Sequence, residues 1–443
     1  MGTIAIIGAG LAGCECALQL ARRNIPVTLF EQKPGTMSPA HTSPNFAELV
    51  CSNSLRSDEV TSGVGLLKQE MRDLNGELMA VADAVRVPAG KALAVDRELF
   101  AAAATARVQA EPHITLVQTE IVSLDDARLA GYDRVVIAAG PLASDSLSAS
   151  LAEALGQTHL YFYDAIAPIV TGDSIDMSIA FRGSRYGEVG EGDYLNCPMS
   201  REEYHAFYEA LLAGEKVKGH AFEKETHFEG CMPVEALAER GEKTLAFGPL
   251  KPVGFVDPRT GQRPWAILQL RPENNNATMF NLVGCQTKLT HPAQARCFRM
   301  VPGLQHAEFV RFGSMHRNTY VNAPTVLDSE LSLAGCGRPH VHLAGQITGV
   351  EGYVESMACG LWAGLMLAAK CRGSDLPQPP RTTALGALLG HLSTPTKHFQ
   401  PSNVHFGLMP EPEMRVKKKE RKEWYAVRAR RDFANWMQTC LQK

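Results

Sequence analysis

The chain has 443 residues, 45% of them hydrophobic, and its 44 Lys and Arg against 47 Asp and Glu give a formal net charge of -3. This length and composition suffice for several packed cores and exclude disorder as a description of the whole chain. The small negative charge excludes a global attraction to nucleic acid or membranes, so a polyanion would have to bind at a local patch.

The first predicted element is a dinucleotide-binding βαβ unit over residues 3–31. An apolar strand is followed by a glycine turn, a helix, a second strand and an acid at Glu31. Gly8 permits the tight turn, Gly10 lets the backbone approach a pyrophosphate, and Gly13 lets the helix pack on the strand. Phosphate is attracted to the helix N-terminus, and Glu31 is placed to accept from a ribose hydroxyl. We therefore assign cofactor binding to Gly8, Ala9, Gly10, Leu11, Ala12, Gly13 and Glu31.

Two later elements favour FAD over NAD as the dinucleotide. Residues 133–140 form an apolar strand that ends in small residues and Gly140, where two-domain flavoproteins pass the chain near FAD. Residues 342–346 form another strand, followed by a glycine loop and a helix-like run from Glu355. The N-terminus of that helix could face the flavin or its phosphates. Gly140, Gly345 and Gln346 are therefore added to the predicted cofactor site.

These elements predict an α/β chain with a discontinuous Rossmann-like FAD-binding domain, an α+β insertion domain and a basic C-terminal segment. The predicted ranges are 1–160 and 323–372 for the two parts of the FAD domain, 161–322 for the insertion and 373–443 for the C-terminal segment. Nine Lys and Arg side chains lie within residues 415–431, opposed by only two acids, Glu420 and Glu423. The longest apolar helix, expected around 358–369, is shorter than the roughly 18 residues of a membrane span.

Two cysteines are candidates for chemistry. Cys51 is followed by hydroxyl and amide side chains and by Arg56, which could favour a thiolate, although a buried structural cysteine is an equal alternative. Cys231 lies beside a glycine and a proline with Glu235 four residues later, and an inert turn cysteine is its alternative. There is no Cys-x-x-Cys pair, so a zinc site or a dithiol centre has no support, and we predict no metal.

The eleven cysteines are scattered through a long chain and do not look like a disulfide framework. The first apolar run also lacks the basic flank of a signal peptide. We therefore expect a cytoplasmic protein without a membrane partner. Residues 315–320, Met-His-Arg-Asn-Thr-Tyr, gather polar groups around His316 and Asn318 that could contact a planar ligand, or could form a hydrogen-bonded turn.

Several longer motifs together resemble one known family. They are GAGLAG, SPAH, FAELVCSNSLRS, RVPAG with AVDR, YLNCPM, FEGCMPVE, FGPLKPVG with DPRTG, MHRNTY with NAP, and AGQITGVEGY. In this order and over nearly the whole chain they are similar to the folate- and FAD-dependent tRNA uracil-5-methyltransferases, the TrmFO flavoproteins. GAGLAG alone also fits the related GidA flavoproteins, in which a longer helical C-terminal region would be expected.

The resemblance implies methylation of uridine at C5 in the tRNA T-loop. The carbon would come from 5,10-methylenetetrahydrofolate, and NADH or NADPH would reduce FAD. The resemblance further implies that a cysteine thiolate adds to uracil C6. We assign this role to Cys231 and place Cys51 as its partner near the flavin. The reverse assignment, with Cys51 as the nucleophile and Cys231 as its partner, stays open.

Substrate contacts are also implied by the resemblance. His316 and Asn318 would lie in the folate or base pocket, and Lys417, Lys418 and Lys419 would contact RNA phosphates, with a solvated surface as the alternative. Ribosomal RNA as the substrate, a FAD-dependent oxidoreductase of a small metabolite, and a non-catalytic RNA-binding flavoprotein stay open as other functions. The sequence gives no oligomeric state.

Overall fold

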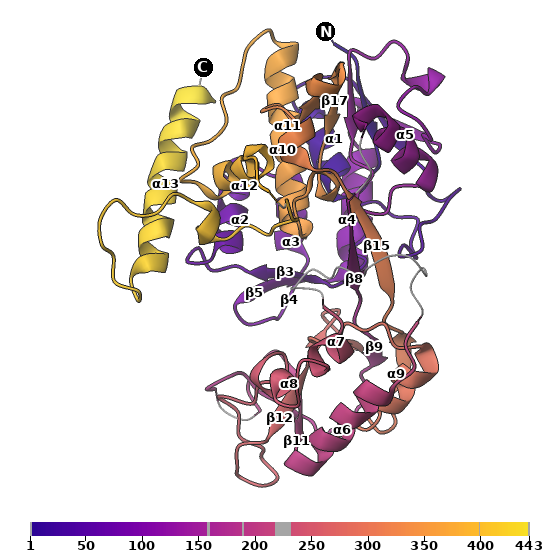
Figure 1. The fold of residues 1–443 in the computed structure, drawn as a ribbon, viewed down its shortest axis with the longest axis vertical. Helices are drawn as coiled ribbons and strands as arrows, with labels where there is room; N and C mark the ends of the chain where they lie inside the picture. The colour runs from indigo at the N-terminus through magenta and orange to yellow at the C-terminus, as the bar shows by residue number, and fades with distance from the viewer. Residues whose placement is uncertain (1, 157–159, 188–189, 218–231, 398, 442–443) are drawn as a thin grey trace.

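A computed structural model describes residues 2–156, 160–187, 190–217, 232–397 and 399–441 of the chain. The described chain forms two bodies of unequal size, stacked along the long axis in Figure 1. The larger body contains both chain ends, and the smaller body is made from the middle of the sequence. Each body has its own buried hydrophobic cluster, as the two sets of core residues show.

The larger body is built on a six-stranded sheet in the order β16-β17-β7-β1-β2-β6. The five strands from β17 to β6 are parallel, and β16 pairs antiparallel at one edge. Strands on both sides of the middle segment of the chain share this sheet, so the predicted discontinuous Rossmann-like fold is confirmed. The strand bounds are β1 Ile4–Ile7, β2 Val27–Glu31, β6 Ile114–Gln118, β7 Arg134–Ile137, β16 Ser332–Leu333 and β17 Arg338–Leu343.

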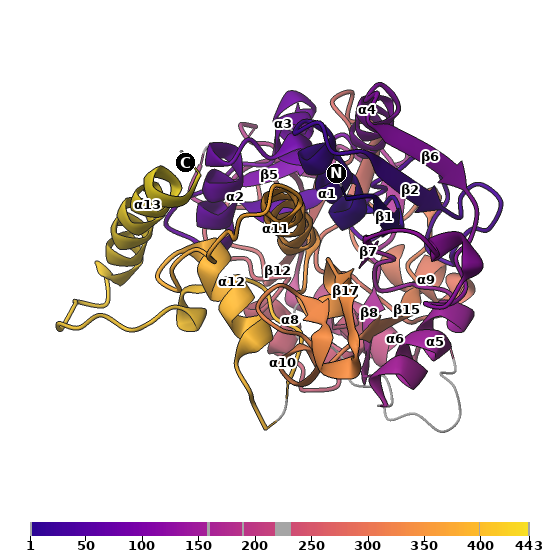
Figure 2. The same cartoon turned by 90° about the horizontal axis from the view of Figure 1, so that it is seen from above.

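Helices cover this sheet, and two of them cross with very little space between their backbones. Helix α1 (Leu11–Ala21) packs against α11 (Tyr353–Cys371), as the adjacent helices in Figure 2 show. A Cβ atom added at Gly360 would lie 2.2 Å from the carbonyl oxygen of Ala12. The other helices of this body are α2 Gly63–Asp73, α3 Glu77–Ala84, α4 Arg97–Gln109, α5 Asp145–Leu155, α10 Ala323–Val326, α12 Ala384–Ser393 and α13 Arg421–Cys440.

Helix α11 corrects one expectation from the sequence. The apolar helix was expected to be shorter than a membrane span, but α11 has 19 residues and is long and apolar enough by those two criteria. Its extra length comes from Tyr353–Met357 at the start and Lys370–Cys371 at the end, which the apolar run did not include. Because 83% of its most apolar window is buried inside the protein, the helix forms part of the core of the larger body.

The smaller body is a mixed α+β unit, as predicted for the middle of the chain. Its sheet has the order β10-β11-β12-β13-β9-β14, and every neighbouring pair is antiparallel. The bounds are β9 Ile169–Thr171, β10 Phe181–Arg182, β11 Leu195–Met199, β12 Ala266–Pro272, β13 Met279–Leu282, β14 Phe309–Arg311, α6 Arg201–Ala213, α7 Val234–Ala238, α8 Thr244–Phe247 and α9 His291–Phe298.

A two-stranded ribbon connects the two bodies. Strand β8 (Leu160–Ala165) enters the smaller body and β15 (Met315–Tyr320) leaves it, and the two pair antiparallel along their whole length. Figure 1 shows this ribbon between the upper and lower parts of the molecule. A second small sheet, β3-β5-β4, lies in the larger body, with β3 at Ser54–Ser57, β4 at Arg86–Val87 and β5 at Ala92–Val95.

The C-terminal segment is attached by aromatic side chains on one face of α13. Tyr425, Phe433 and Trp436 are buried, and the indole nitrogen of Trp436 donates to the carbonyl of Pro377 at 2.9 Å. Figure 2 shows α13 at the opposite side of the molecule from β6. The domain boundaries given above remain predictions, since the two cores fix only the elements that each contains.

The crossing of α1 and α11 leads to a stability prediction. Gly360→Ala should lower the free energy of unfolding by about 1–3 kcal/mol, because the added methyl group meets the backbone of Ala12, which cannot move without shifting α1. Urea unfolding measures this change. Gly335→Ala is the control, because its Cβ meets nothing within 4 Å, and it should leave the unfolding curve unchanged. Equal stability of the two variants would contradict the tight crossing.

Candidate functional site

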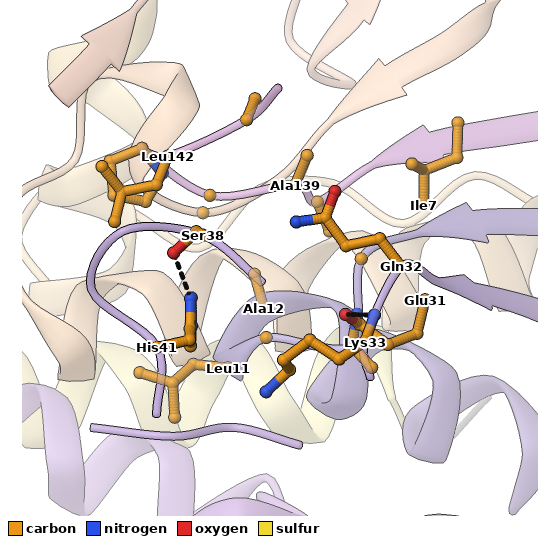
Figure 3. Close-up of a pocket in the computed structure, with 18 of the residues that line it drawn as sticks. Ile7, Leu11, Ala12, Glu31, Gln32, Lys33, Ser38, His41, Ala139 and Leu142 are labelled. Carbon is orange, nitrogen blue, oxygen red and sulfur yellow. Dashed lines mark hydrogen bonds between the residues drawn. The ribbon is translucent and has the colours of Figure 1, made fainter. Parts of the chain in front are cut away.

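A cavity of about 1100 Å³, part of it open to solvent, lies at the carboxyl ends of the parallel strands. Ligands bind at this edge of open α/β sheets, because the strands end there and their loops diverge. Figure 3 shows the cavity with side chains from the glycine turn, from the end of β2 and from the loop after β7 pointing toward it. The predicted residues that line it are Gly8, Ala9, Gly10, Leu11, Ala12, Glu31, Gly140, Gly345 and Gln346.

The three glycines of the first turn have different surroundings. Gly8 has a φ of +100°, and a Cβ there would lie 2.7 Å from the carbonyl oxygen of Ala138. A Cβ at Gly13 would lie 1.9 Å from the carbonyl oxygen of Gly8, so Gly13 serves packing and does not line the cavity. Gly10 lines the cavity and a Cβ there would meet nothing within 4 Å. Of these three glycines, Gly10 is the one at which a side chain would point into open space.

Glu31 ties the end of β2 to the glycine turn. Its carboxylate accepts from the backbone N–H of Ala9 at 2.6 Å and from that of Lys33 at 2.9 Å, and the residue is buried. A carboxylate has about four acceptor positions, so Glu31 can still accept from a ribose hydroxyl in the cavity that it lines.

The opposite wall is formed by the loop after β17. Gly345 has a φ of +83°, and a Cβ there would lie 2.8 Å from the side chain of Ala12. The amide of Gln346 donates to the carboxylate of Glu351 at 2.6 Å, which fixes the loop before α11. Gly140, with a φ of +70°, lets the chain turn away after β7. The cavity is therefore closed by segments that lie far apart in the sequence.

The cavity fits a dinucleotide. Gly10 is the N-cap of α1 and has no side chain to cap the first N–H groups of the helix. These donors, together with the positive end of the helix dipole, make a phosphate site at the point where Gly10 leaves open space. The donor set, the acid at Glu31 and the size of the cavity fit the pyrophosphate and ribose of FAD.

Cys51 lies next to this cavity. The phenolic oxygen of Tyr353, a residue that lines the cavity from the start of α11, accepts from the backbone N–H of Cys51 at 2.6 Å and from that of Ser52 at 3.2 Å. The sulfur of Cys51 lies 3.9 Å from the carbonyl oxygen of Ala165, where β8 ends. Burial is the main cause of a raised pKa of Tyr353, and the nearby Cys51 raises it further. The phenol therefore stays neutral and its oxygen remains an acceptor.

The cations near Cys51 differ from the one expected. Arg56 forms an ion pair with the buried Glu355, so its charge is committed there. Arg97 and Arg311 are the arginines whose pKa values respond to Cys51. Burial is the largest effect on Arg97 and lowers its pKa. The negative charge of Glu273, with smaller contributions from Tyr353 and Cys51, outweighs burial, so the pKa of Arg97 is raised overall. Both arginines lie in the electrostatic surroundings of Cys51.

The smaller body also holds the Cys51 loop. Asn53 is fully buried, and its amide donates to the carbonyls of Val95 and Pro272 at 3.0 Å each. Arg271 on β12 donates to the side-chain oxygen of Asn53 at 2.8 Å and to the hydroxyl of Ser52 at 2.7 Å. A movement of β12 relative to the larger body would therefore move the loop that carries Cys51.

Two histidines share the electrostatic surroundings of this site. His41 lines the cavity, and its Nδ1 lies 2.6 Å from the hydroxyl oxygen of Ser38, as Figure 3 shows. Burial, followed by Lys33, lowers the pKa of His41. Burial is the main cause that lowers the pKa of His316, and the nearby charges of Arg311 and His41 lower it further. Both imidazoles are therefore neutral near pH 7. One nitrogen of each is already paired with a serine hydroxyl, Nδ1 of His41 with Ser38 and Nε2 of His316 with Ser314 at 2.9 Å, which leaves the other nitrogen for a ligand.

The structure does not bring every predicted residue to the cavity. His316 and Asn318 lie on β15, outside the lining of the cavity, and Asn318 is buried. Lys417, Lys418 and Lys419 are exposed, precede α13 and do not line it. Cys231 lies outside the described residues. Among the residues that the structure describes, no group of three His, Cys, Asp or Glu could hold a metal ion.

Several residues of the site were missed by reasoning from the sequence. Tyr353, Arg97 and Arg311 act on Cys51 from three separate elements, so no local pattern links them to it. His41 lies in the motif SPAH and Tyr353 lies in the motif AGQITGVEGY, but neither motif indicates which residues these side chains contact.

Comparison with known proteins decides the family. The family described as Glucose inhibited division protein A matches residues 3–375. The methylenetetrahydrofolate--tRNA-(uracil-5-)-methyltransferase TrmFO of Lawsonia intracellularis is 65% identical over 434 residues, 98% of this chain and 97% of its own length. The protein of that name from Nitratidesulfovibrio vulgaris is 68% identical and covers 98% of this chain and 90% of its own length. The chain belongs to the TrmFO family.

The family assignment confirms the resemblance seen in the sequence motifs. A crystal structure of Aquifex aeolicus GidA aligns with a TM-score of 0.68, covering 98% of this chain and 73% of that one. At 15% sequence identity this likeness shows a shared fold and no more. The chain thus shares its architecture with GidA, and its 65% and 68% identity is to proteins named TrmFO.

The open space at Gly10 leads to a prediction about cofactor binding. Gly10→Val should give a folded but colourless protein, because the new side chain enters the phosphate site without meeting any protein atom around its Cβ. Visible absorbance of the purified protein and its far-UV circular dichroism measure the two effects. Gly335→Ala should stay yellow. A Gly10→Val protein with full flavin absorbance would show that the phosphate site lies elsewhere.

Proposed function

We propose that the protein methylates uridine at C5 in the T-loop of tRNA, with 5,10-methylenetetrahydrofolate as the carbon donor. The observation that carries this proposal is the position of Cys51, which Tyr353 holds beside the dinucleotide cavity by two hydrogen bonds. The names of relatives at 65% and 68% identity state the same reaction. When bound, FAD reduced by NADH or NADPH supplies the two electrons that bring the folate carbon to a methyl group.

The residues of the chain have separate parts in this reaction. The glycine turn and Glu31 bind the dinucleotide, and the wall formed by Gly345 and Gln346 closes the cavity behind it. Uracil C5 is a weak nucleophile until a thiolate adds to C6, so one cysteine must attack the base. We assign this step to Cys231 and the position near the cofactor to Cys51, where the latter can relay a proton.

Two arginines supply positive charge in the surroundings of Cys51. Arg97 and Arg311 lie within electrostatic reach of it, and the neutral Tyr353 holds the backbone of its loop. His316 and His41, both neutral near pH 7, would then contact the folate or the extruded base by hydrogen bonds. Asn318, two residues along the same strand as His316, would contribute to the same pocket.

Nucleoside mass spectrometry tests the proposed reaction. Unmodified tRNA incubated with the protein, methylenetetrahydrofolate and NADH or NADPH should yield 5-methyluridine without S-adenosylmethionine. Ribosomal RNA and RNA-free reactions run in parallel test the two other enzyme functions. NAD(P)H oxidation that proceeds without any methylated nucleoside would favour an oxidoreductase of a small metabolite.

The two cysteines lead to a prediction about the nucleophile. Cys231→Ala should abolish 5-methyluridine formation and leave flavin colour and NAD(P)H oxidation intact, because only the addition to C6 is lost. Cys51→Ala should also lower methylation, with altered flavin reactivity, because its loop lies against the cavity. RNA that contains 5-fluorouracil should trap a covalent complex, since fluorine cannot leave C5 as a proton does. Peptide mapping of this complex identifies the attacking residue.

A cysteine elsewhere in the chain serves as the control for these variants. Cys440 is partly buried at the end of α13, and Cys440→Ala should methylate as the unmodified protein does. Attachment of the fluorinated base at Cys51 would reverse the two roles. Methylation that survives both substitutions would remove thiol catalysis from the proposal.

The basic run before α13 leads to a prediction about RNA affinity. Lys417, Lys418 and Lys419 are exposed and have no ion-pair partner within the described chain. Replacing all three with Ala should weaken tRNA binding and flatten the dependence of log K on log salt by about 0.7–0.9 for each RNA phosphate that is no longer neutralised. Binding titrations at several salt concentrations measure the slope. A slope equal to that of the unmodified protein would make this run a solvated surface.

A further inference from the structure

A second hollow lies on the smaller body, away from the dinucleotide cavity. It encloses about 1790 Å³ of space, including open solvent, between the start of α6, helix α8 and the loop before β12. We name it the insertion groove; its charged and aromatic lining residues are Arg201, Glu203, Phe247, Lys251, Asp257, Arg259, Arg263 and Trp265. In Figure 1 the elements α6, α8, β11 and β12 lie at the lower end of the molecule, whereas α1 and β17 lie in the upper part.

The charge of the insertion groove is positive and largely available. Its two carboxylates are occupied: Asp257 pairs with Arg259 at 2.8 Å, and Glu203 accepts from the backbone N–H of Ser200 at 2.7 Å. Arg201, Lys251 and Arg263 are exposed and have no carboxylate partner in the part of the chain that the structure describes. Four cations against two carboxylates leave the lining of the groove with a net positive charge of two, although the chain as a whole is slightly acidic.

Aromatic rings stand among these cations. Phe247 is 76% exposed at the end of α8, and Trp265 is 37% exposed with the guanidinium of Arg201 over its ring at 5.2 Å. Tyr186 is 80% exposed beside the groove, where its backbone N–H donates to the carbonyl of Gly254 at 2.7 Å. Exposed rings of this size are costly in water, because each leaves apolar surface unburied. Their exposure calls for a ligand with flat faces.

We propose that the insertion groove binds an unpaired stretch of RNA. Bases that are not stacked in a helix pack on exposed aromatic rings, while Arg and Lys contact the phosphates between them. Phe247 is the stacking residue, and Lys251 and Arg263 are the phosphate contacts, whereas Arg201 already lies over the ring of Trp265. The rings and cations line one hollow, so a single strand bound there would meet both.

This inference rests on the proposed function and deepens it. The groove lies on the smaller body and shares no lining residue with the cavity, so the stretch that it binds is separate from the uridine that is methylated. The groove therefore contributes affinity for a full-length tRNA and nothing to the chemistry at C5. A short T-arm hairpin, which contains the target uridine but no remote unpaired strand, would not use it.

Binding titrations with two RNAs test the proposal. Phe247→Ala should weaken binding of full-length tRNA about 5- to 150-fold and leave binding of the T-arm hairpin unchanged. Lys251→Ala with Arg263→Ala should flatten the salt dependence of log K for full-length tRNA by about 0.7 for each single-strand phosphate that is no longer neutralised. All three side chains are exposed, so folding does not depend on them.

The controls separate this inference from the proposed function. Arg296→Ala removes an exposed cation on α9, away from the groove, and should bind both RNAs as the unmodified protein does. Full-length tRNA binding that is unchanged in all groove variants would overturn the inference, and so would equal losses for the hairpin. A raised KM for NAD(P)H with unchanged tRNA binding would overturn it as well, because the groove would then hold a nicotinamide dinucleotide. If no 5-methyluridine forms even with the unmodified protein, the proposed function fails, while these titrations still report on the groove.

Discussion

The close approach of helix α1 to its neighbours is the constraint on which the rest of the structure depends. Side chains are absent wherever α1 meets another backbone: Gly13 against the carbonyl of Gly8, and Gly360 of α11 against the carbonyl of Ala12. Gly345 meets the side chain of Ala12 in the same way. Because α1 is fixed so tightly, its N-terminal N–H groups point at one place in the cavity, which a phosphate site needs.

The same contacts join parts of the chain that are far apart in the sequence. Strands β1 and β7 come from the first third of the chain, and β17 and α11 return after the smaller body. The α1–α11 crossing therefore holds the larger body together across the insertion. It also places Tyr353, at the start of α11, where its phenol meets the Cys51 loop.

The Cys51 loop is hydrogen-bonded to both bodies. Tyr353 binds its backbone from the larger body, and Arg271 binds Ser52 and Asn53 from β12 of the smaller body. A loop held from both sides has little freedom, and a reactive thiol gains precision when the loop that carries it is ordered. The smaller body thus has a part in ordering the site as well as a groove of its own.

The sequence by itself determined the Rossmann-like fold and the residues of the glycine turn, because these form a local pattern: a strand, a tight turn and a helix in one run of about 30 residues. It also determined the family, through motifs that lie in order over nearly the whole chain. It also located Gly140, Gly345 and Gln346, since each directly follows an apolar strand. Tertiary structure alone decided that Arg97 and Arg311, and not Arg56, lie in the electrostatic surroundings of Cys51.

The physical reason is that these contacts join residues that no spacing rule connects. Arg56 follows Cys51 by five positions, but the buried carboxylate of Glu355 on α11 takes its charge. Likewise, Phe247 begins the motif FGPLKPVG and Trp265 precedes a strand, but nothing in these patterns links the two, and only the folding of α8 and β12 around one hollow sets them among the cations there. Local pattern fixed the glycine turn that lines the cavity, and long-range packing decided which charges and rings surround Cys51 and the insertion groove.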